Sequence, residues 1–187
     1  MSRIAGIDFA AASPQVAREL IGVTLLLDGV GGVIIETEAY DRADPASHSF
    51  AGPTKRNGPM FGPPGHAYVY RSYGMHWCLN FVCSPDGHGA GVLLRALAPI
   101  EGLAHMHERR GLQEQRLLCA GPGRLCQALA VSDRHNGLSI AAPPFELRPA
   151  TVAVEVVVGP RVGISKAVDV PWRFGLAGSR LLSKPFR

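Results

Sequence analysis

A series of β-rich runs separated by short turns restricts the fold of this chain more than any other feature of its sequence. The glycine-rich DGVGG separates VTLLL from VIIETEAY, Gly74 lies between AYVYRSY and HWCLNFVC, and a turn at Asp86–Gly87 precedes GVLLRALAP. Strands joined by such short connections pair antiparallel, because a parallel crossover needs a dozen or more residues. The sequence therefore predicts a central antiparallel sheet and argues against a parallel Rossmann sheet.

Helices are expected around this sheet. Ser13 as N-cap and Pro14 as first helical residue predict a helix over 14–21, residues 101–118 have a helical pattern broken near Gly111, and GPGRLCQALAV begins another helix near Pro122. Further strands are expected in FELRP and TVAVEVVV. A chain of 187 residues suits one domain. We therefore expect a single α+β domain over residues 1–187, with a curved antiparallel β-sheet core and surrounding helices.

Residues 41–66 interrupt this regular pattern. The segment is rich in Pro, Gly, Asn and Ser and has no hydrophobic period, so it is predicted to be one long loop. Loops of this length in a compact domain are usually functional or disordered.

The charges are unevenly distributed along the chain. Residues 1–50 hold three basic and seven acidic side chains, whereas residues 51–187 hold sixteen basic and eight acidic ones. An acidic cluster inside a basic protein is consistent with catalysis on an anionic substrate. The sixteen arginines against three lysines suit phosphate recognition, although genomic base composition produces the same bias.

Several classes of protein are disfavoured by simple patterns. No apolar run approaches the roughly 20 residues that a membrane helix needs, so no membrane association is expected. The start MSRIAGIDFA has no long apolar stretch, which predicts a cytoplasmic protein, associated with the nucleoid in a bacterium. Neither His76-x-Cys78 with Cys83 nor His105-x-His107 completes a four-ligand zinc pattern, so we expect no metal and no cofactor.

One strand is predicted to place two carboxylates and a phenol on the same face. The period of two in VIIETEAY groups Ile34, Glu36, Glu38 and Tyr40. An edge strand with a solvated face would show the same alternation.

The aromatic run that follows suggests a second component of a site. Tyr68 and Tyr70 alternate, Tyr73 stands beside Gly74, and Arg71 accompanies them. Aromatic side chains with arginines can stack on nucleobases, at about 1–3 kcal/mol per base. Tyrosines of an ordinary core are the alternative.

These residues belong to a long recognisable pattern. The run ETEAYDRADPASHSFAGPTKRNGPMFGPPGHAYVYRSYGMHWCLNFVC, followed by DGHGAGVLLRALAPIEG, closely resembles the alkyladenine (3-methyladenine) DNA glycosylase family. ARELIG before it, and GPGRLCQALA, RVGISKA and PWRF after it, match in the same order. The resemblance thus covers nearly the whole chain.

The resemblance implies roles for individual positions. Glu38, the second acid of ETEAY, matches the family's general base, and Arg95 matches an arginine near the catalytic water and the phosphate. Glu36 is expected to have a structural or supporting role. The resemblance identifies no substituted functional position, although His76–Trp77 is a stretch whose identity bears on pocket shape and substrate range.

The same comparison implies how a damaged base is held. Tyr40, His48 and Tyr70 match side chains that stack on or contact the flipped base, and Asn80 matches a residue that sterically disfavours the amino group of guanine. Tyr73 matches the residue inserted into the duplex. The candidates for contacts with the DNA backbone are Arg56, Arg71 and Arg124.

The implied function is that of a monofunctional DNA glycosylase. It would flip alkylated or deaminated purines out of double-stranded DNA and hydrolyse the N-glycosidic bond with a Glu-activated water, starting base excision repair. The family's lesions include 3-methyladenine, 7-methylguanine, hypoxanthine and ethenoadenine. Because such an enzyme surrounds one lesion, a monomer is expected.

Two other functions are weighed against this one. A damaged-base sensor without catalysis is disfavoured by the intact Glu38, and a small-molecule purine nucleosidase is disfavoured by Tyr73 and the basic surplus. Strand cleavage would need a lysine nucleophile, and of Lys55, Lys166 and Lys184 only the first is expected near the cluster. The turn Gly121–Gly123 faintly resembles the hairpin of a different glycosylase fold, but phosphate binding or a simple turn explains it as well.

Overall fold

The computed structural model describes residues 3–186. Ten strands and three α-helices occur in these residues, with 3₁₀ turns at Gly58–Phe61, Gln115–Leu117 and Asp133–His135. In chain order the elements are β1 (Arg3–Ile4), β2 (Ile7–Asp8), α1 (Ser13–Glu19), β3 (Thr24–Leu27), β4 (Val30–Tyr40), β5 (Ala67–Ser72), β6 (His76–Cys83), β7 (Ala90–Glu101), α2 (Leu103–Arg110), α3 (Pro122–Ala128), β8 (Phe145–Arg148), β9 (Val156–Gly159) and β10 (Arg173–Leu176).

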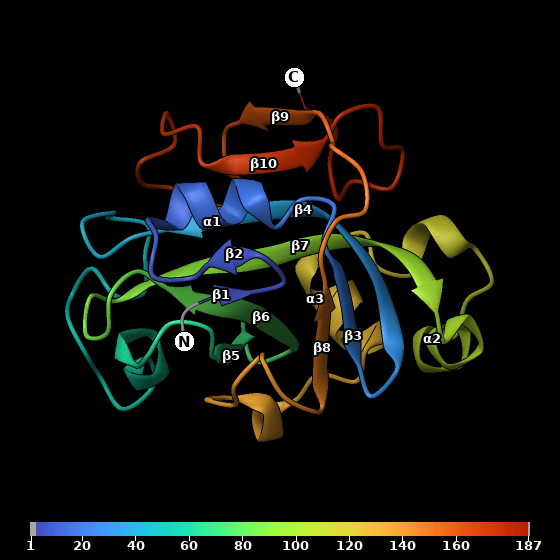
Figure 1. Ribbon diagram of the computed structural model, residues 1–187, viewed down its shortest axis with the longest axis horizontal. Coiled ribbons are helices and arrows are strands. Elements are labelled where there is room, and N and C mark those ends of the chain that lie inside the picture. The colour runs from blue at the N-terminus through green and yellow to red at the C-terminus, as the bar shows by residue number, and fades with distance from the viewer. Residues whose placement is uncertain (1–2, 187) are drawn as a thin grey trace.

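The long strand β4 organises an eight-stranded antiparallel sheet (Figure 1). The strand order is β5-β6-β7-β4-β10-β9, and β3 pairs with both β4 and β8. On one side β4 pairs with β7 along its length, whereas on the other its first residues pair with β3 and its last with β10. The sheet therefore divides at β4 and curls into a half-barrel.

Two glycines inside β4 permit this close packing. A Cβ at Gly31 would lie 1.9 Å from the Leu25 carbonyl oxygen, and one at Gly32 would lie 2.0 Å from that of Ala98. Only glycine fits where strand backbones approach so closely. The predicted turn DGVGG is therefore shorter than expected, because Gly31 and Gly32 belong to the strand.

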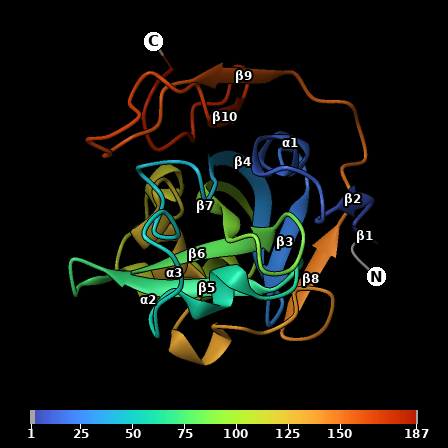
Figure 2. The same cartoon turned by 90° about the vertical axis from the view of Figure 1, so that its left-hand side faces the viewer.

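The helices pack on the central strands of the sheet (Figures 1 and 2). Helix α1 packs on β4, β7 and β10, while α3 packs on β6 and β7 and is itself covered by α2. Most of the buried apolar side chains, among them Phe9, Phe81 and Leu20, form one core between these layers, and Met60, Tyr68 and Val82 form a second, smaller cluster. In Figure 2 the β5–β6 hairpin projects from this body.

The predicted α+β class with a curved antiparallel sheet is confirmed, and several element boundaries are corrected. The N-cap of α1 is Ala12, so Ser13 lies inside the first turn. The expected helix over 101–118 is shorter, because β7 runs to Glu101 and α2 ends before Gly111, which has a φ of 64°. In TVAVEVVV only the last residues join a strand.

None of the helices in residues 3–186 combines the length and the apolar character needed to cross a bilayer. The four cysteines are buried free thiols.

Candidate active site

Two register shifts between β4 and β7 direct the charged side chains toward one another. Ile34 pairs with Leu97 and Glu36 with Ala96, while Thr37 pairs with Leu94, so the ladder passes over Ile35 and Arg95. Such bulges redirect side chains and are common beside active sites. The shift also moves Ile34 into the main core, which corrects its predicted place on the face of Glu36.

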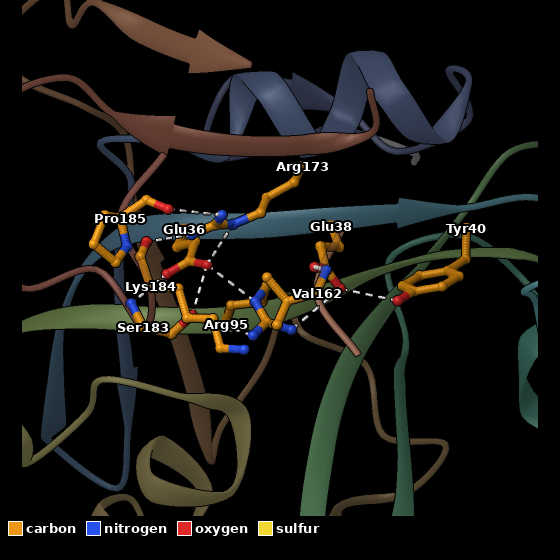
Figure 3. A network of polar contacts seen from close by, with 9 residues as sticks. All are labelled: Glu36, Glu38, Tyr40, Arg95, Val162, Arg173, Ser183, Lys184 and Pro185. Atoms are coloured by element: carbon orange, nitrogen blue, oxygen red, sulfur yellow. Dashed lines mark hydrogen bonds and ion pairs between the residues drawn. The ribbon is translucent and has the colours of Figure 1, made fainter. Parts of the chain in front are cut away.

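Glu36 and Glu38 are the two carboxylates of a network of hydrogen bonds and ion pairs, the polar cluster (Figure 3). Its other side chains are those of Tyr40, Arg95, Arg173 and Ser183. Both carboxylate side chains are 0% exposed. Glu38 Oε2 accepts hydrogen bonds from the Tyr40 hydroxyl at 2.9 Å and from Arg95 Nη1 at 3.2 Å, and Oε1 accepts one from the Val162 backbone N–H at 2.6 Å. The carboxylate of Glu38 is thus held both by side chains of the sheet and by the backbone at Val162, more than 120 residues away in the sequence.

Arg95 lies between the two carboxylates. Its Nε donates to Glu36 Oε1 at 3.0 Å, in addition to the Nη1 contact with Glu38. Burial lowers the pKa of Arg95, but the charges of Glu38 and Glu36 outweigh this effect and raise it above its ordinary value. Arg95 therefore remains a cation.

A cavity of about 640 Å³ opens next to this cluster. Its wall includes Arg95 and Val162, whereas the buried Glu38 lies behind them. The lining residues are Tyr40, Pro45, Ala46, His48, Arg56, Met60, Tyr68, Tyr70, Ser72, Tyr73, Cys78, Asn80, Leu93, Arg95, Pro122, Val162, Gly163, Ile164, Ser165 and Lys166.

One wall of the cavity is aromatic. The rings of His48 and Tyr70 pack edge to face with their centres 4.5 Å apart, and the rings of Tyr68 and Tyr70 stack with their centres 5.5 Å apart. His48 Nδ1 lies 3.2 Å from the Tyr68 hydroxyl, and Asn80 Nδ2 donates to the Tyr68 carbonyl at 3.1 Å. These contacts hold the rings and the amide in place before any ligand arrives.

Burial keeps the ring groups of the cavity neutral. It raises the pKa of Tyr68 to about 12 and moves the pKa of Tyr40 and of Tyr70 well above the usual tyrosine range, with the Glu38 charge adding to the effect on Tyr40. Burial, followed by the nearby Arg56, lowers the pKa of His48 below its ordinary value of 6.5. The wall thus presents neutral rings at pH 7.

Tyr73 is at the tip of the β5–β6 hairpin and at the rim of the cavity. It is 87% exposed and has a φ of 50°, in the left-handed region that few residues other than glycine adopt. Gly74 follows with a φ of 69°. The turn thus holds an aromatic ring in solvent at the rim of the cavity, in a backbone conformation that costs free energy.

The chain matches the profile of one protein family over residues 7–180, that of the methylpurine-DNA glycosylases. The chain belongs to this family. It is 67% identical over 181 residues to a protein of Nitrosospira multiformis, an alignment that covers 97% of this chain and 94% of that protein. It is 60% identical to a protein of Nitrobacter winogradskyi over 96% of this chain and 86% of the relative. Both relatives are named "Putative 3-methyladenine DNA glycosylase".

Membership in the methylpurine-DNA glycosylase family confirms the resemblance and the enzyme class that the sequence predicts. The structure brings most of the predicted site residues to one cavity. Its wall contains Arg95, Tyr40, His48, Tyr70, Asn80, Tyr73 and Arg56. Arg71 and Arg124 lie close by: Arg71 accepts a hydrogen bond from Arg56 at its carbonyl, and Arg124 follows the cavity residue Pro122 in α3.

Several residues at this candidate site were not expected from the sequence. Arg161 lies 4.7 Å from the Tyr40 ring and forms a buried ion pair with Asp44, which ties residues 41–66 to the cavity wall. The expectation that Lys55 alone among the lysines lies near the cluster is wrong, because Lys166 lines the cavity. Only their place in the matching RVGISKA run could have indicated Arg161 and Lys166.

Proposed function

We propose that this protein is a monofunctional DNA glycosylase that flips alkylated or deaminated purines out of duplex DNA and hydrolyses their N-glycosidic bonds, acting as a cytoplasmic monomer. The observation that carries the proposal is the position of a buried carboxylate, Glu38, behind the wall of an aromatic cavity of about 640 Å³, which is large enough for a purine nucleotide, in a member of the methylpurine-DNA glycosylase family. The relatives' names support 3-methyladenine as one substrate.

The aromatic wall accounts for the preference for damaged purines. Alkylation at N3 or N7 makes the base a cation, which neutral π faces attract by about 0.5–2 kcal/mol. Tyr40, His48 and Tyr70 supply those faces, and each is neutral at pH 7. We assign to Asn80, which lines the cavity and is fixed by its hydrogen bond to Tyr68, the steric exclusion of the amino group of guanine.

Glu38 and Arg95 account for the chemistry. The departing purine leaves an oxocarbenium-like sugar, and a water attacks its C1′ carbon as it transfers a proton to a base. Within residues 3–186, Glu38 Oε1 accepts one hydrogen bond and Oε2 accepts two. We therefore assign proton acceptance to Oε1, beside Val162 at the cavity wall.

The position of Lys166 requires a direct test of the monofunctional assignment. A lysine amine can attack the sugar aldehyde left after base loss and form a Schiff base that cleaves the strand. We assign hydrolysis to Glu38 because that carboxylate has three protein partners in place, whereas Lys166 is an exposed residue at the cavity wall.

The deciding experiment uses duplexes that each carry one lesion and a panel of free modified nucleosides. We expect abasic sites in the duplexes, seen as strand breaks only after alkali treatment, and no release of base from nucleosides. Binding without abasic sites would identify a sensor, and turnover of nucleosides would identify a nucleosidase. Strand breaks without alkali, with trapping by borohydride, would show a lyase step through an amine, for which Lys166 is the candidate at the cavity wall.

The pH dependence of lesion choice is expected to report on His48. Because the pKa of His48 lies below 6.5, the ring is neutral at pH 7 and becomes charged only as the pH falls further. A charged ring repels a cationic base, so the excision ratio of 7-methylguanine to ethenoadenine should be highest where His48 is neutral and should decrease as the pH falls and the ring becomes charged. His48→Gln should make this ratio independent of pH, and a wild-type ratio that rises in acid would contradict the assignment.

Affinity for undamaged duplex is expected to depend on salt. Arg95 is paired with two carboxylates, so we assign the phosphate contacts to the exposed Arg56, Arg71 and Arg124. Three contacts predict a decrease in affinity of about 40-fold between about 50 and 200 mM salt. Each of these Arg→Gln changes should reduce the steepness of log affinity plotted against log salt concentration by about 0.9. Arg148→Gln, at an exposed ion-paired site on β8, should leave this slope unchanged. A slope near zero in wild type would count against a DNA substrate.

A further inference from the structure

Glu36 is the most heavily bonded carboxylate in the polar cluster, although it does not line the cavity. Its Oε1 accepts hydrogen bonds from Arg95 Nε at 3.0 Å, Arg173 Nε at 2.8 Å and the Ser183 hydroxyl at 2.7 Å, and its Oε2 accepts one from the Ser183 backbone N–H at 2.5 Å. Only one of these partners, Arg95, lines the cavity, whereas all three partners of Glu38 do, so Glu36 acts on a substrate only through Arg95.

The partner that reaches the cavity is Arg95. Its guanidinium donates three hydrogen bonds, each to a different residue: Nε donates to Glu36, Nη1 to Glu38 and Nη2 to the Ser183 hydroxyl at 3.1 Å (Figure 3). Because the guanidinium is a rigid planar fork, fixing Nε and Nη2 leaves only Nη1 for Glu38. Glu38 therefore receives a single Arg95 hydrogen bond instead of the stronger bidentate pair.

The C-terminal segment, residues 183–186, completes this arrangement. Arg173 donates to the carbonyls of Lys184 and Pro185, and its guanidinium lies 4.0 Å from the centre of the Phe186 ring. The same ring packs where β10 has Gly175, since a Cβ there would lie 2.4 Å from it. The segment is thus anchored on β10, with Ser183 held against Glu36.

We propose that Glu36, held by Ser183 and Arg173, is a positioning residue that limits how strongly Arg95 pairs with Glu38. This inference rests on the proposed function of Glu38 as the base. Without Glu36, the Arg95 fork is free to turn toward Glu38 and to occupy the oxygen that receives the proton of water. The charges of the cluster balance as they stand, with two carboxylates and two guanidiniums.

Thr37 provides a matched control for a purely structural effect. It lies between the two acids on β4, but its hydroxyl donates to the Ala17 carbonyl of α1 at 2.8 Å, on the opposite face of the sheet. Thr37→Val therefore removes one buried hydrogen bond without touching Arg95.

The test compares single-turnover excision, lesion-duplex affinity and Tm for wild type, Glu36→Gln, Ser183→Ala and Thr37→Val. We expect Glu36→Gln to slow excision about 30-fold or more and Ser183→Ala about fivefold, with affinities within about threefold of wild type. Thr37→Val should lower Tm but keep the excision rate within about twofold. Equal rate losses in Glu36→Gln and Thr37→Val would overturn the proposal.

A second measurement does not depend on activity. In ¹⁵N-arginine-labelled protein, the Nε–H signal that disappears in Arg95→Lys should exchange slowly with water in wild type and Thr37→Val, and rapidly in Glu36→Gln and Ser183→Ala. Unchanged exchange in both of the latter variants would refute the positioning role. Wild type that excises no lesion while showing the expected exchange would instead refute the proposed function.

Discussion

Glu38→Gln is expected to abolish most turnover while leaving lesion binding nearly intact. The amide keeps the shape of the carboxylate beneath the cavity wall but loses its ability to accept a proton from water. General-base catalysis typically contributes about 10²–10⁴-fold, so we expect a loss of that size in the single-turnover rate. Affinity for a lesion duplex should remain within about threefold of wild type, because Glu38 does not line the cavity.

The controls for this prediction separate chemistry from folding. A Tm close to that of wild type would show that the variant keeps its fold, and Thr37→Val reports the effect of a neighbouring buried change on the same strand. Single-turnover excision by Glu38→Gln within about tenfold of wild type would exclude Glu38 as the base.

Tyr73→Ala is expected to slow excision from duplex DNA far more than from single strands. Inserting the phenol into the stack offsets part of the few kcal/mol that unstacking costs, so its loss lowers the population of flipped base. We expect a decrease of about tenfold or more on duplex and about twofold or less on single-stranded DNA carrying the same lesion. A fluorescent base analogue beside the lesion should report less flipping in the variant.

The exposed side chain of Val158 on β9 supplies the control for this test, because Val158→Ala also truncates an exposed apolar residue but far from the hairpin in sequence. It should match wild type on both substrates. Equal losses for Tyr73→Ala on duplex and single strands, with unaltered flipping, would place Tyr73 in the pocket and not in the duplex.

The sheet could be predicted because its information is local. Alternating apolar residues and short turns determine strands such as β5 and β6 without reference to distant parts of the chain. The alternation also placed Glu36 and Glu38 correctly on one face. The alternation placed Ile34 on the wrong face, because a register shift between β4 and β7 at Ile35 interrupts it. Such a shift depends on the partner strand and cannot be recognised from the alternating pattern of β4 alone.

The hydrogen bonds that hold the two carboxylates could not be predicted, because their donors lie far away in the sequence. Ser183 reaches Glu36 across 147 residues, and Val162 reaches Glu38 across 124. The spacing of residues within one strand or helix does not reveal which distant backbone N–H will bond to a carboxylate. It also does not reveal that the guanidinium of Arg161 packs against the Tyr40 ring. Such contacts become visible only when the sheet has brought β4 and the last quarter of the chain together.

Glycosylase activity that depends on Glu38 is measured most directly as the release of free base from methylated duplex DNA, followed by chromatography, with wild type and Glu38→Gln at equal concentration. We expect wild type to release methylated purines and to leave abasic sites in equal number, whereas Glu38→Gln binds the same DNA and releases almost none. Wild type that releases no methylated base would refute the glycosylase activity, and Glu38→Gln that releases it as fast as wild type would refute the role of Glu38.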